Sequence, residues 1–295
     1  MPSSCRLRRS VLYVPASNEK ALAKLPHLDC DAAIIDLEDS VVPEEKDRAR
    51  ERMRAVLSGR DREGKEIIVR INALSSEWGG EDLLAARACR PDAILLPKVD
   101  TPRGVLDAND ALDQADAPAS LKLWAMIETP KAMLNLGAIA ELGRDPSARL
   151  ECLVAGTNDL VKETGVLATA DRRYIMPWLM QMVLAARAGG LDALDGVSND
   201  FRDEEAFARE CGEARAMGFD GKTLIHPAQI GPANAVFSPS GAEIAEAEAL
   251  REAFARPENS GRGAIALNGR MVERLHLEQA GRLLARAAAM KERDR

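Results

Sequence analysis

Eight short apolar runs recur along the first three quarters of the chain, each rich in Val, Ile, Leu and Ala. Each run is followed by polar residues and then by an Ala, Leu, Arg and Glu pattern that is typical of a helix. The runs are continuous rather than alternating, which indicates strands buried on both faces, as in a parallel sheet. They occupy residues 10–15, 32–39, 66–72, 93–99, 122–128, 150–156, 191–197 and 222–227.

Eight strands that alternate with helices predict an α/β fold of the TIM (β/α)8 barrel type, because parallel strands need a crossover helix between them. A doubly wound open sheet has the same alternation. We favour the closed barrel because no GxGxxG turn follows the first apolar run.

The pattern changes after the eighth run. Two helical patterns, at about 239–256 and 273–292, flank the segment AIALNGRMV, in which Asn268-Gly269 predicts the tight turn of a hairpin. We therefore predict a catalytic barrel over residues 1–232. Residues 233–295 would form a C-terminal helical arm that packs on the barrel or on a neighbouring subunit.

Composition and charge limit the partners. Of the 295 residues, 46% are hydrophobic and 29% charged, which is ordinary for a soluble globular protein. The net charge of −7 and the lack of a long basic run argue against nucleic acid or an anionic membrane as a partner. The apolar stretch at 11–14 is too short for a signal peptide, and no segment is long enough to span a membrane. We expect a cytoplasmic protein.

Charged residues follow several of the predicted strands, at the end of a barrel where catalytic residues lie. Because buried charges must be paired or bind a metal, these residues are candidates for a site. They are Glu38 and Asp39 after the second strand, Arg70 after the third, Lys98 after the fourth, Glu128 after the fifth and Asp159 after the sixth.

Glu128 and Asp159 follow adjacent strands, so their carboxylates could converge on one cation. Two carboxylates with waters and substrate oxygens are typical of a Mg²⁺ site, and Mn²⁺ has similar needs. The alternative is that each carboxylate caps the following helix or pairs with a basic side chain. The pattern alone leaves both interpretations open.

The two basic residues also have two interpretations each. Arg70 suits a planar, bidentate partner such as a substrate carboxylate, or it pairs with Glu38 or Asp39. Lys98 could form a Schiff base, but the neighbouring acids favour a structural ion pair.

Seven motifs along the chain together resemble the HpcH/HpaI aldolase and citrate lyase β-subunit-like family, which includes malyl-CoA, citramalyl-CoA and citryl lyases. The resemblance covers nearly the whole chain and implies a TIM barrel that forms a homotrimer or homohexamer. The motifs, in order, are RSVLYVPASNEKALAKL, IIDLEDSV, VRIN, LLPKV, IETPKAMLN, LVAGTNDL and FDGKTLIHPAQI.

The resemblance also implies roles for these residues. Glu128 and Asp159 would bind Mg²⁺, Arg70 would hold a substrate carboxylate, and Glu38 and Asp39 would orient waters around the cation. A coenzyme A (CoA) thioester would be the substrate, bound near the end of the first strand by Tyr13, Asn18 and Lys24. Positive charge for its phosphates would come from Lys24 and from the N-terminal Arg6, Arg8 and Arg9.

The implied activity is Mg²⁺-dependent cleavage of a C–C bond in a small 3-hydroxyacyl-CoA such as malyl-CoA or citramalyl-CoA. A separate acid must protonate the enolate that forms. Relatives with a long tail carry an Asp as this acid after a Gly-Lys-Met motif, whereas this chain has Glu273 after Gly269-Arg270-Met271. Two alternatives stay open: a thioesterase that uses the same site, and a citryl lyase subunit that works within a larger complex.

Overall fold

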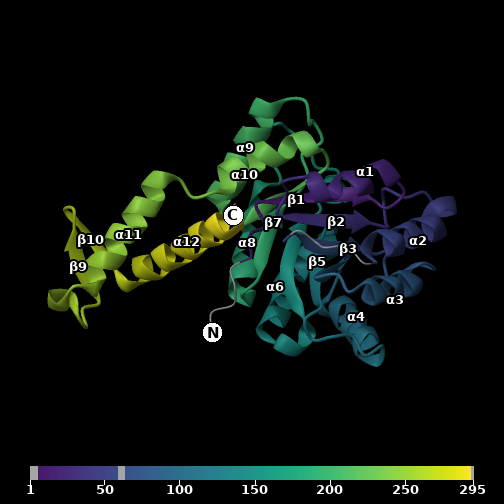
Figure 1. Cartoon of the computed structure of the whole chain (residues 1–295), viewed down its shortest axis with the longest axis horizontal. Coiled ribbons are helices and arrows are strands. Elements are labelled where there is room, and N and C mark those ends of the chain that lie inside the picture. Colours follow the sequence, from purple (N-terminus) through teal and green to yellow (C-terminus); the bar gives the residue numbers. More distant parts are fainter. Residues whose placement is uncertain (1–5, 59–63, 294–295) are drawn as a thin grey trace. The chain divides into compact units, whose positions relative to one another are not determined.

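All eight apolar runs form strands that close into one parallel barrel in the computed structural model, which describes residues 6–58 and 64–293 (Figure 1). Each strand pairs with its neighbours in chain order, and β1 closes the ring by pairing with β8. The predicted TIM barrel is thereby confirmed. The strands are β1 (Ser10–Pro15), β2 (Ala32–Asp36), β3 (Glu66–Arg70), β4 (Ala93–Leu96), β5 (Lys122–Ile127), β6 (Leu150–Ala155), β7 (Asp192–Asp195) and β8 (Gly221–Leu224).

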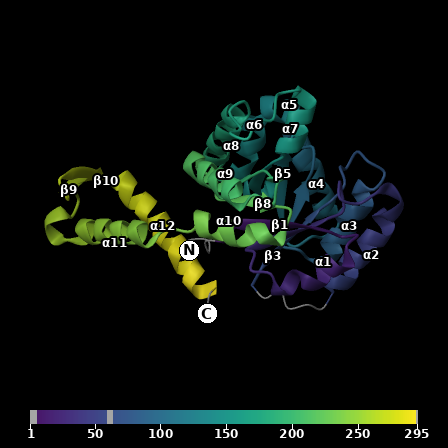
Figure 2. The same ribbon diagram turned by 90° about the horizontal axis from the view of Figure 1, so that it is seen from above.

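Helices surround the barrel on its outer side (Figure 2). Several begin at sequence signals: Asn18 caps α1, and Thr129 caps α5 with Pro130 in the first turn. The helices of this unit are α1 (Glu19–Lys24), α2 (Lys46–Leu57), α3 (Gly79–Cys89), α4 (Pro102–Gln114), α5 (Pro130–Leu134), α6 (Leu136–Glu141), α7 (Thr157–Thr164), α8 (Met176–Gly189), α9 (Glu204–Met217) and α10 (Ile230–Phe237).

Alternate strand residues face opposite sides of the barrel wall. One series packs with the helices and includes Leu12, Ile35 and Val69. The other series fills the inside of the barrel. Its buried members are Val11, Ala32, Ile34, Ile68, Ala93, Leu95, Trp124, Met126, Cys152, Val154 and Leu194.

Arg8 fills the end of the barrel where the strands begin. Its guanidinium lies 4.8 Å from the centroid of the Trp124 ring and pairs with Glu66 and Asp192 at 2.7 Å and with Glu151 at 2.8 Å. The adjacent Arg9 is also buried. Both side chains are therefore placed at the end of the barrel away from the strand ends that carry catalytic residues.

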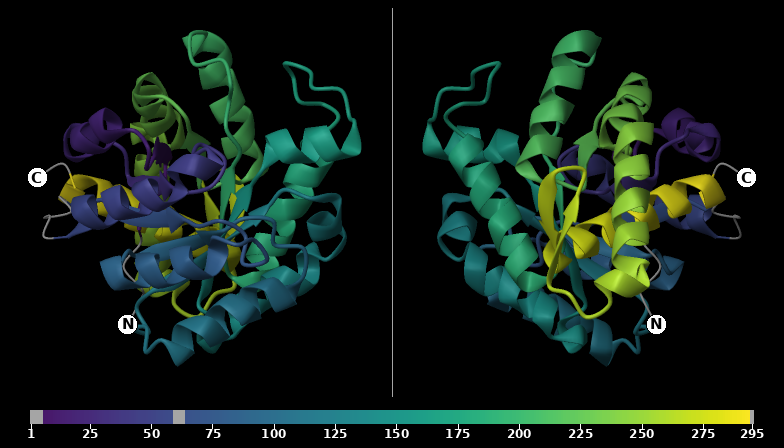
Figure 3. Two further views of the ribbon diagram at one scale, coloured as in Figure 1. Left: turned by 90° about the vertical axis from the view of Figure 1, so that its right-hand side faces the viewer. Right: turned by 90° about the vertical axis from the view of Figure 1, so that its left-hand side faces the viewer.

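The chain divides into two compact units, one spanning Arg8–Phe237 and the other containing the segment from Ser238 onward. The second unit contains α11 (Gly241–Ala255), β9 (Ala264–Leu267), β10 (Arg270–Glu273) and α12 (Arg274–Arg293). The strands form the predicted hairpin, drawn in yellow in Figure 3, and both turn residues have positive φ, 51° at Asn268 and 76° at Gly269. This is the backbone that favours Asn-Gly in a two-residue turn. The two helices pack through a small apolar cluster that includes Ala247, Leu250 and Ala280.

None of the helices in the described ranges is long and apolar enough to cross a lipid bilayer.

Candidate active site

A cavity of about 340 Å³ opens at the carboxyl ends of the barrel strands. Its lining combines charged residues with a few apolar ones. Four of the predicted site residues line it: Tyr13, Asp39, Arg70 and Asp159. The other lining residues include Asp36, Ser40, Met126, Gly156, Thr157, Asn158, Val197 and Thr223.

The strand alternation explains why these side chains meet. Arg70 continues the inward series of Ile68, and Met126 continues that of Trp124. The same period of two carries Ala32 and Ile34 forward to Asp36. The interior is therefore apolar along most of the strands and becomes charged where they end.

Arg70 is held side-on by Asp36. The guanidinium donates from Nε to Oδ1 and from Nη2 to Oδ2 of Asp36, each at 2.7 Å. Burial raises the Asp36 pKa, but the Arg70 charge and several hydrogen bonds outweigh this, and the pKa is lowered overall. No role was predicted for Asp36, although its place in the inward series was a signal that could have revealed its contact with Arg70.

The Nη1 side of Arg70 faces Glu38 and Asp39. Nη1 lies 3.0 Å from Glu38 Oε2 and 3.5 Å from Asp39 Oδ2, and it donates to the Met126 sulfur at 3.7 Å. Both ion pairs expected as the alternative to substrate binding are therefore present. Because Arg70 also lines the cavity, a substrate carboxylate could reach this edge of the guanidinium by competing with Glu38.

Lys98 bridges two of the carboxylates. Its Nζ donates to Glu38 Oε1 at 2.5 Å, and its backbone N–H donates to Glu128 Oε1 at 2.6 Å. Burial lowers the pKa of Lys98, but the bond to Glu38 and the surrounding carboxylates raise it overall. The amine is protonated, so the ion-pair interpretation of Lys98 is supported over the Schiff base.

Glu128 carries the least satisfied polar group of the site. Its residue is fully buried, and its Oε2 has no hydrogen-bond partner among the described residues. Burial, and next the charge of Glu38, raise the pKa of Glu128 to about 8. Thr129, rather than Glu128, caps the following helix, which contradicts the capping alternative for Glu128.

Because Gly156 has no side chain, there is room beside it for the Glu128 carboxylate. A Cβ at Gly156 would lie 2.2 Å from the Glu128 Cβ and 2.9 Å from its Oε2, so no other residue fits without movement. Gly156 also lines the cavity, as does Asp159 in the first turn of α7. The unpartnered oxygen of Glu128 thus lies against Gly156, which lines the same cavity as Asp159.

These oxygens fit a hard divalent cation. Two carboxylates with room for further oxygen ligands match Mg²⁺ or Mn²⁺, and a buried unpaired carboxylate oxygen is costly unless a cation binds it. Within residues 6–58 and 64–293 there is no cluster of three or more His, Cys, Asp or Glu side chains able to hold a metal. Any cation here would take its remaining ligands from water or substrate.

The three residues expected to bind CoA lie in different surroundings. The Tyr13 ring lines the cavity under Arg70, whose guanidinium is 4.9 Å from the ring centroid. Asn18 is exposed and uses its side chain to cap α1, and Lys24 is exposed in the last turn of that helix. Arg8 and Arg9 were wrongly expected to serve CoA phosphates, because both are buried in ion pairs at the opposite end of the strands.

Glu273 ends β10 in the C-terminal unit. The residue is exposed, and its backbone N–H donates to His276 Nδ1 at 3.0 Å.

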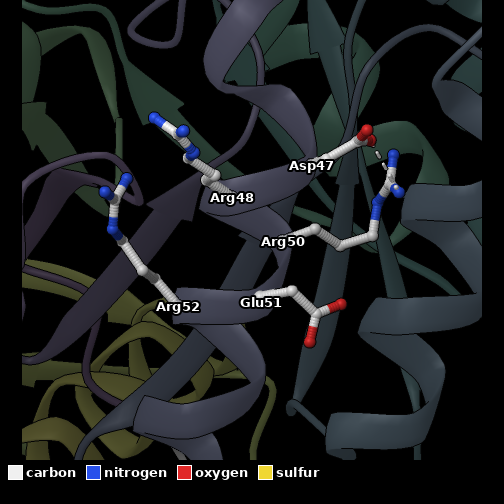
Figure 4. A pocket seen from close by; sticks show the side chains of 5 residues that line it. All are labelled: Asp47, Arg48, Arg50, Glu51 and Arg52. Carbon is white, nitrogen blue, oxygen red and sulfur yellow. Dashed lines mark hydrogen bonds and ion pairs between the residues drawn. The ribbon is translucent and has the colours of Figure 1, made fainter.

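A second hollow lies on α2 and is a weaker candidate. Figure 4 shows its charged lining, in which Arg50 pairs with Asp47 at 3.2 Å. The other two arginines of this lining, Arg48 and Arg52, pair with Glu45. The charges are matched on the outer surface of a helix, so this hollow has no unsatisfied group for a ligand.

Comparison with known proteins agrees with the fold. Residues 9–227 match the HpcH/HpaI aldolase/citrate lyase family, and the chain belongs to this family. The chain is 47% identical over 282 residues to a (3S)-malyl-CoA thioesterase of Cereibacter sphaeroides (strain KD131 / KCTC 12085), covering 96% of this chain and 95% of the relative. It is 35% identical to the mitochondrial citramalyl-CoA lyase of Rattus norvegicus, covering 97% and 88%.

One similar solved structure is that of CitE from Mycobacterium tuberculosis in complex with magnesium, acetoacetate and coenzyme A. It superposes with a TM-score of 0.76 at 30% identity, covering 95% of this chain and 97% of that one. The predicted family and the prediction of an enzyme related to CoA-thioester lyases are confirmed.

Proposed function

We propose that this enzyme uses a divalent cation, Mg²⁺ or Mn²⁺, held by Glu128 and Asp159, to act on a small 3-hydroxyacyl-CoA that carries a second carboxylate. The observation that carries the proposal is the buried Oε2 of Glu128, which has no hydrogen-bond partner among the described residues and lies against Gly156, a residue that lines the same cavity as Asp159. Such a cation would stabilise negative charge that develops on substrate oxygens. The magnesium and CoA in the CitE complex support this assignment.

In this proposal Arg70 holds the substrate carboxylate. Asp36 occupies the Nε side of the guanidinium and so points the Nη1 edge toward the cavity. A planar fork held by a buried partner positions a carboxylate with little loss of side-chain freedom. In this pose the hydroxyl-bearing carbon of the substrate lies near Glu128 and Asp159. The CoA part of the bound substrate extends past Tyr13 toward Asn18 and Lys24.

Cleavage of the C–C bond is the first candidate reaction. A base takes the hydroxyl proton, and the bond between the hydroxyl-bearing carbon and the thioester α-carbon breaks. Its electron pair forms the C=C bond of the thioester enolate, and the hydroxyl-bearing carbon becomes the carbonyl of the other product. The enolate carbon must then gain a proton. We assign this proton to Glu273, supplied by the C-terminal unit of a neighbouring subunit in a homotrimer or homohexamer.

Hydrolysis of the thioester is the second candidate, favoured by the 47% identity to a malyl-CoA thioesterase. In this reaction water adds to the thioester carbonyl and the CoA thiol leaves. Binding of the carboxylate by Arg70 would serve both reactions, so the products rather than the binding residues distinguish them.

The test is a panel of CoA esters, including malyl-CoA and citramalyl-CoA, with the purified chain alone and either Mg²⁺ or EDTA. A lyase yields glyoxylate or pyruvate with no free thiol, and a thioesterase yields free CoA and a hydroxy-diacid. Turnover in EDTA, or a rate near that of the wild type in Glu128→Gln, would contradict the proposed site. If no ester is turned over by the purified chain, a subunit that acts only in a larger complex becomes the better account.

The role of Glu273 has its own test. Glu273→Gln should slow protonation of the enolate on the order of 10²-fold, the usual contribution of a general acid. Glu273→Asp, which keeps the acid, should retain most of the rate. Equal rates for Glu273→Gln and the wild type would show that the C-terminal unit supplies no acid.

A further inference from the structure

Lys98 combines two unusual features at one position of the site. It is a non-glycine residue in the left-handed region, with φ of 51°, a conformation that costs an ordinary side chain roughly 1 kcal/mol or more. The two residues beside it in the chain, Pro97 and Val99, are buried, so the backbone is held on both sides. A strained backbone that persists beside a cavity needs a reason.

Lys98 donates two hydrogen bonds, each to a different carboxylate of the site. The backbone N–H of Lys98 reaches Glu128 Oε1 at 2.6 Å, and Nζ reaches Glu38 Oε1 at 2.5 Å. The first bond occupies one oxygen of Glu128 and leaves Oε2 without a partner. The second holds one oxygen of Glu38, whose other oxygen lies 3.0 Å from Arg70 Nη1.

We propose that Lys98 is a positioning residue for the cation: its left-handed backbone turns Glu128 so that Oε2 stays free for the ion, and the bond from its ammonium to Glu38 anchors that backbone in place. This inference rests on the proposed function, since it assumes that Glu128 binds a cation. It adds a residue that touches neither cation nor substrate.

Whether removal of the Lys98 ammonium weakens or tightens cation binding distinguishes a positioning role from simple electrostatics. Lys98 is a positive charge next to a cation site, so electrostatics alone predicts that its removal tightens cation binding. Positioning predicts the opposite, because partners that orient a metal ligand typically contribute roughly 10- to 100-fold in affinity.

The experiment measures binding of Mn²⁺ alone to the full-length protein, by the electron paramagnetic resonance signal of the free ion. Lys98→Met removes the ammonium and keeps the length of the side chain, and we expect at least about tenfold weaker binding. Lys98→Val adds a β-branched side chain that strongly disfavours positive φ, so it should bind more weakly still. Lys98→Gly also lacks the ammonium but adopts this backbone freely, so it should bind at least as tightly as Lys98→Met.

Two control variants make the same changes elsewhere. Lys131→Met removes an exposed ammonium that lies 3.7 Å from Asp100, and Arg90→Val places a β-branched residue at another left-handed position, with φ of 51°. Both should bind Mn²⁺ as the wild type does. Thermal melting of every variant shows which are folded, and if Lys98→Val is not, the comparison of Lys98→Gly with Lys98→Met tests the backbone.

Each outcome has one meaning. Unchanged or tighter binding by folded Lys98→Met overturns the role of the ammonium. Weaker binding by Lys98→Gly than by Lys98→Met overturns the role of the backbone. If the wild type itself binds no Mn²⁺, the proposed metal site is wrong and this inference falls with it.

Discussion

The two ends of the barrel each hold a buried arginine among carboxylates, but among the described residues only one end has buried carboxylate oxygens without a hydrogen-bond partner. At the end where the strands begin, Arg8 has Glu66 on two of its nitrogens, further acids at 2.7 and 2.8 Å, and an indole ring against its face. At the other end Arg70 is fixed by Asp36 on one side, while its Nη1 edge faces a cavity and a looser set of acids.

This difference distinguishes a structural cluster from a binding site. A buried ion network whose hydrogen bonds are all made holds a structure together, whereas a buried carboxylate oxygen without a partner has a desolvation cost that a ligand can relieve. Glu66 belongs to the first kind and Glu128 to the second. Replacing Glu66 by the neutral, isosteric Gln should therefore reduce stability, whereas replacing Glu128 by Gln should reduce activity.

The largest expected effect is on catalysis, in Glu128→Gln. Loss of a charged group that organises the reacting centre should lower kcat/KM on the order of 10²–10³-fold. Without divalent cation, the same change should leave the melting temperature equal or higher, because Gln has no ionised form for burial to disfavour, as the raised pKa of about 8 indicates for Glu128. Steady-state kinetics and calorimetry on one preparation check both halves.

The matched change at the other end, Glu66→Gln, should act on stability instead. It removes the acid that bonds to two Arg8 nitrogens, and breaking a buried pair costs about 3 kcal/mol or more. Denaturant unfolding should show this loss, while kcat/KM of the folded protein stays near the wild-type value. A large kinetic effect with unchanged stability would contradict the division between the two ends.

Arg70→Lys should have a smaller kinetic effect. The ammonium keeps the charge but cannot bond to Asp36 and to a substrate carboxylate through a fork, and the lost hydrogen bonds amount to roughly 10- to 100-fold. We expect this mainly as a higher KM for substrates that carry the second carboxylate. A CoA ester without that group serves as the control and should be affected much less by the substitution.

The smallest expected effect is the thermal shift produced by Mg²⁺. A ligand at ten times its Kd stabilises the folded state by about 1.4 kcal/mol, or roughly 2 °C for a chain of 295 residues. The wild type and Glu66→Gln should both show the shift, and Glu128→Gln should not. Equal shifts in all three proteins would place the cation elsewhere.

Much of the fold was predictable because strands buried on both faces leave a continuous apolar signal. All eight runs became barrel strands, and Asn268-Gly269 forms the turn of the hairpin. The site was predictable to the extent that polar residues follow those strands. No role was predicted for Asp36 at the end of the second strand, and only its alternation with Ala32 and Ile34, which places it inward, indicates that it meets Arg70.

Other features could not be predicted from local pattern. The left-handed backbone of Lys98 carries no signal in a non-glycine residue, and its bond to Glu128 joins positions thirty residues apart. Basic residues near the N-terminus resemble a phosphate site in sequence, yet Arg8 pairs with acids from β3, β6 and β7 that only the closed barrel brings together.

The most direct test of the account is turnover of malyl-CoA by the wild-type enzyme in Mg²⁺, after addition of excess EDTA, and after restoration of Mg²⁺. We predict that activity is lost with EDTA, returns with Mg²⁺, and is at least about 100-fold lower in Glu128→Gln with Mg²⁺. Turnover that persists in EDTA, or a rate near that of the wild type in Glu128→Gln, would contradict the central claim that the unpartnered carboxylate at the open end of the barrel holds an essential cation.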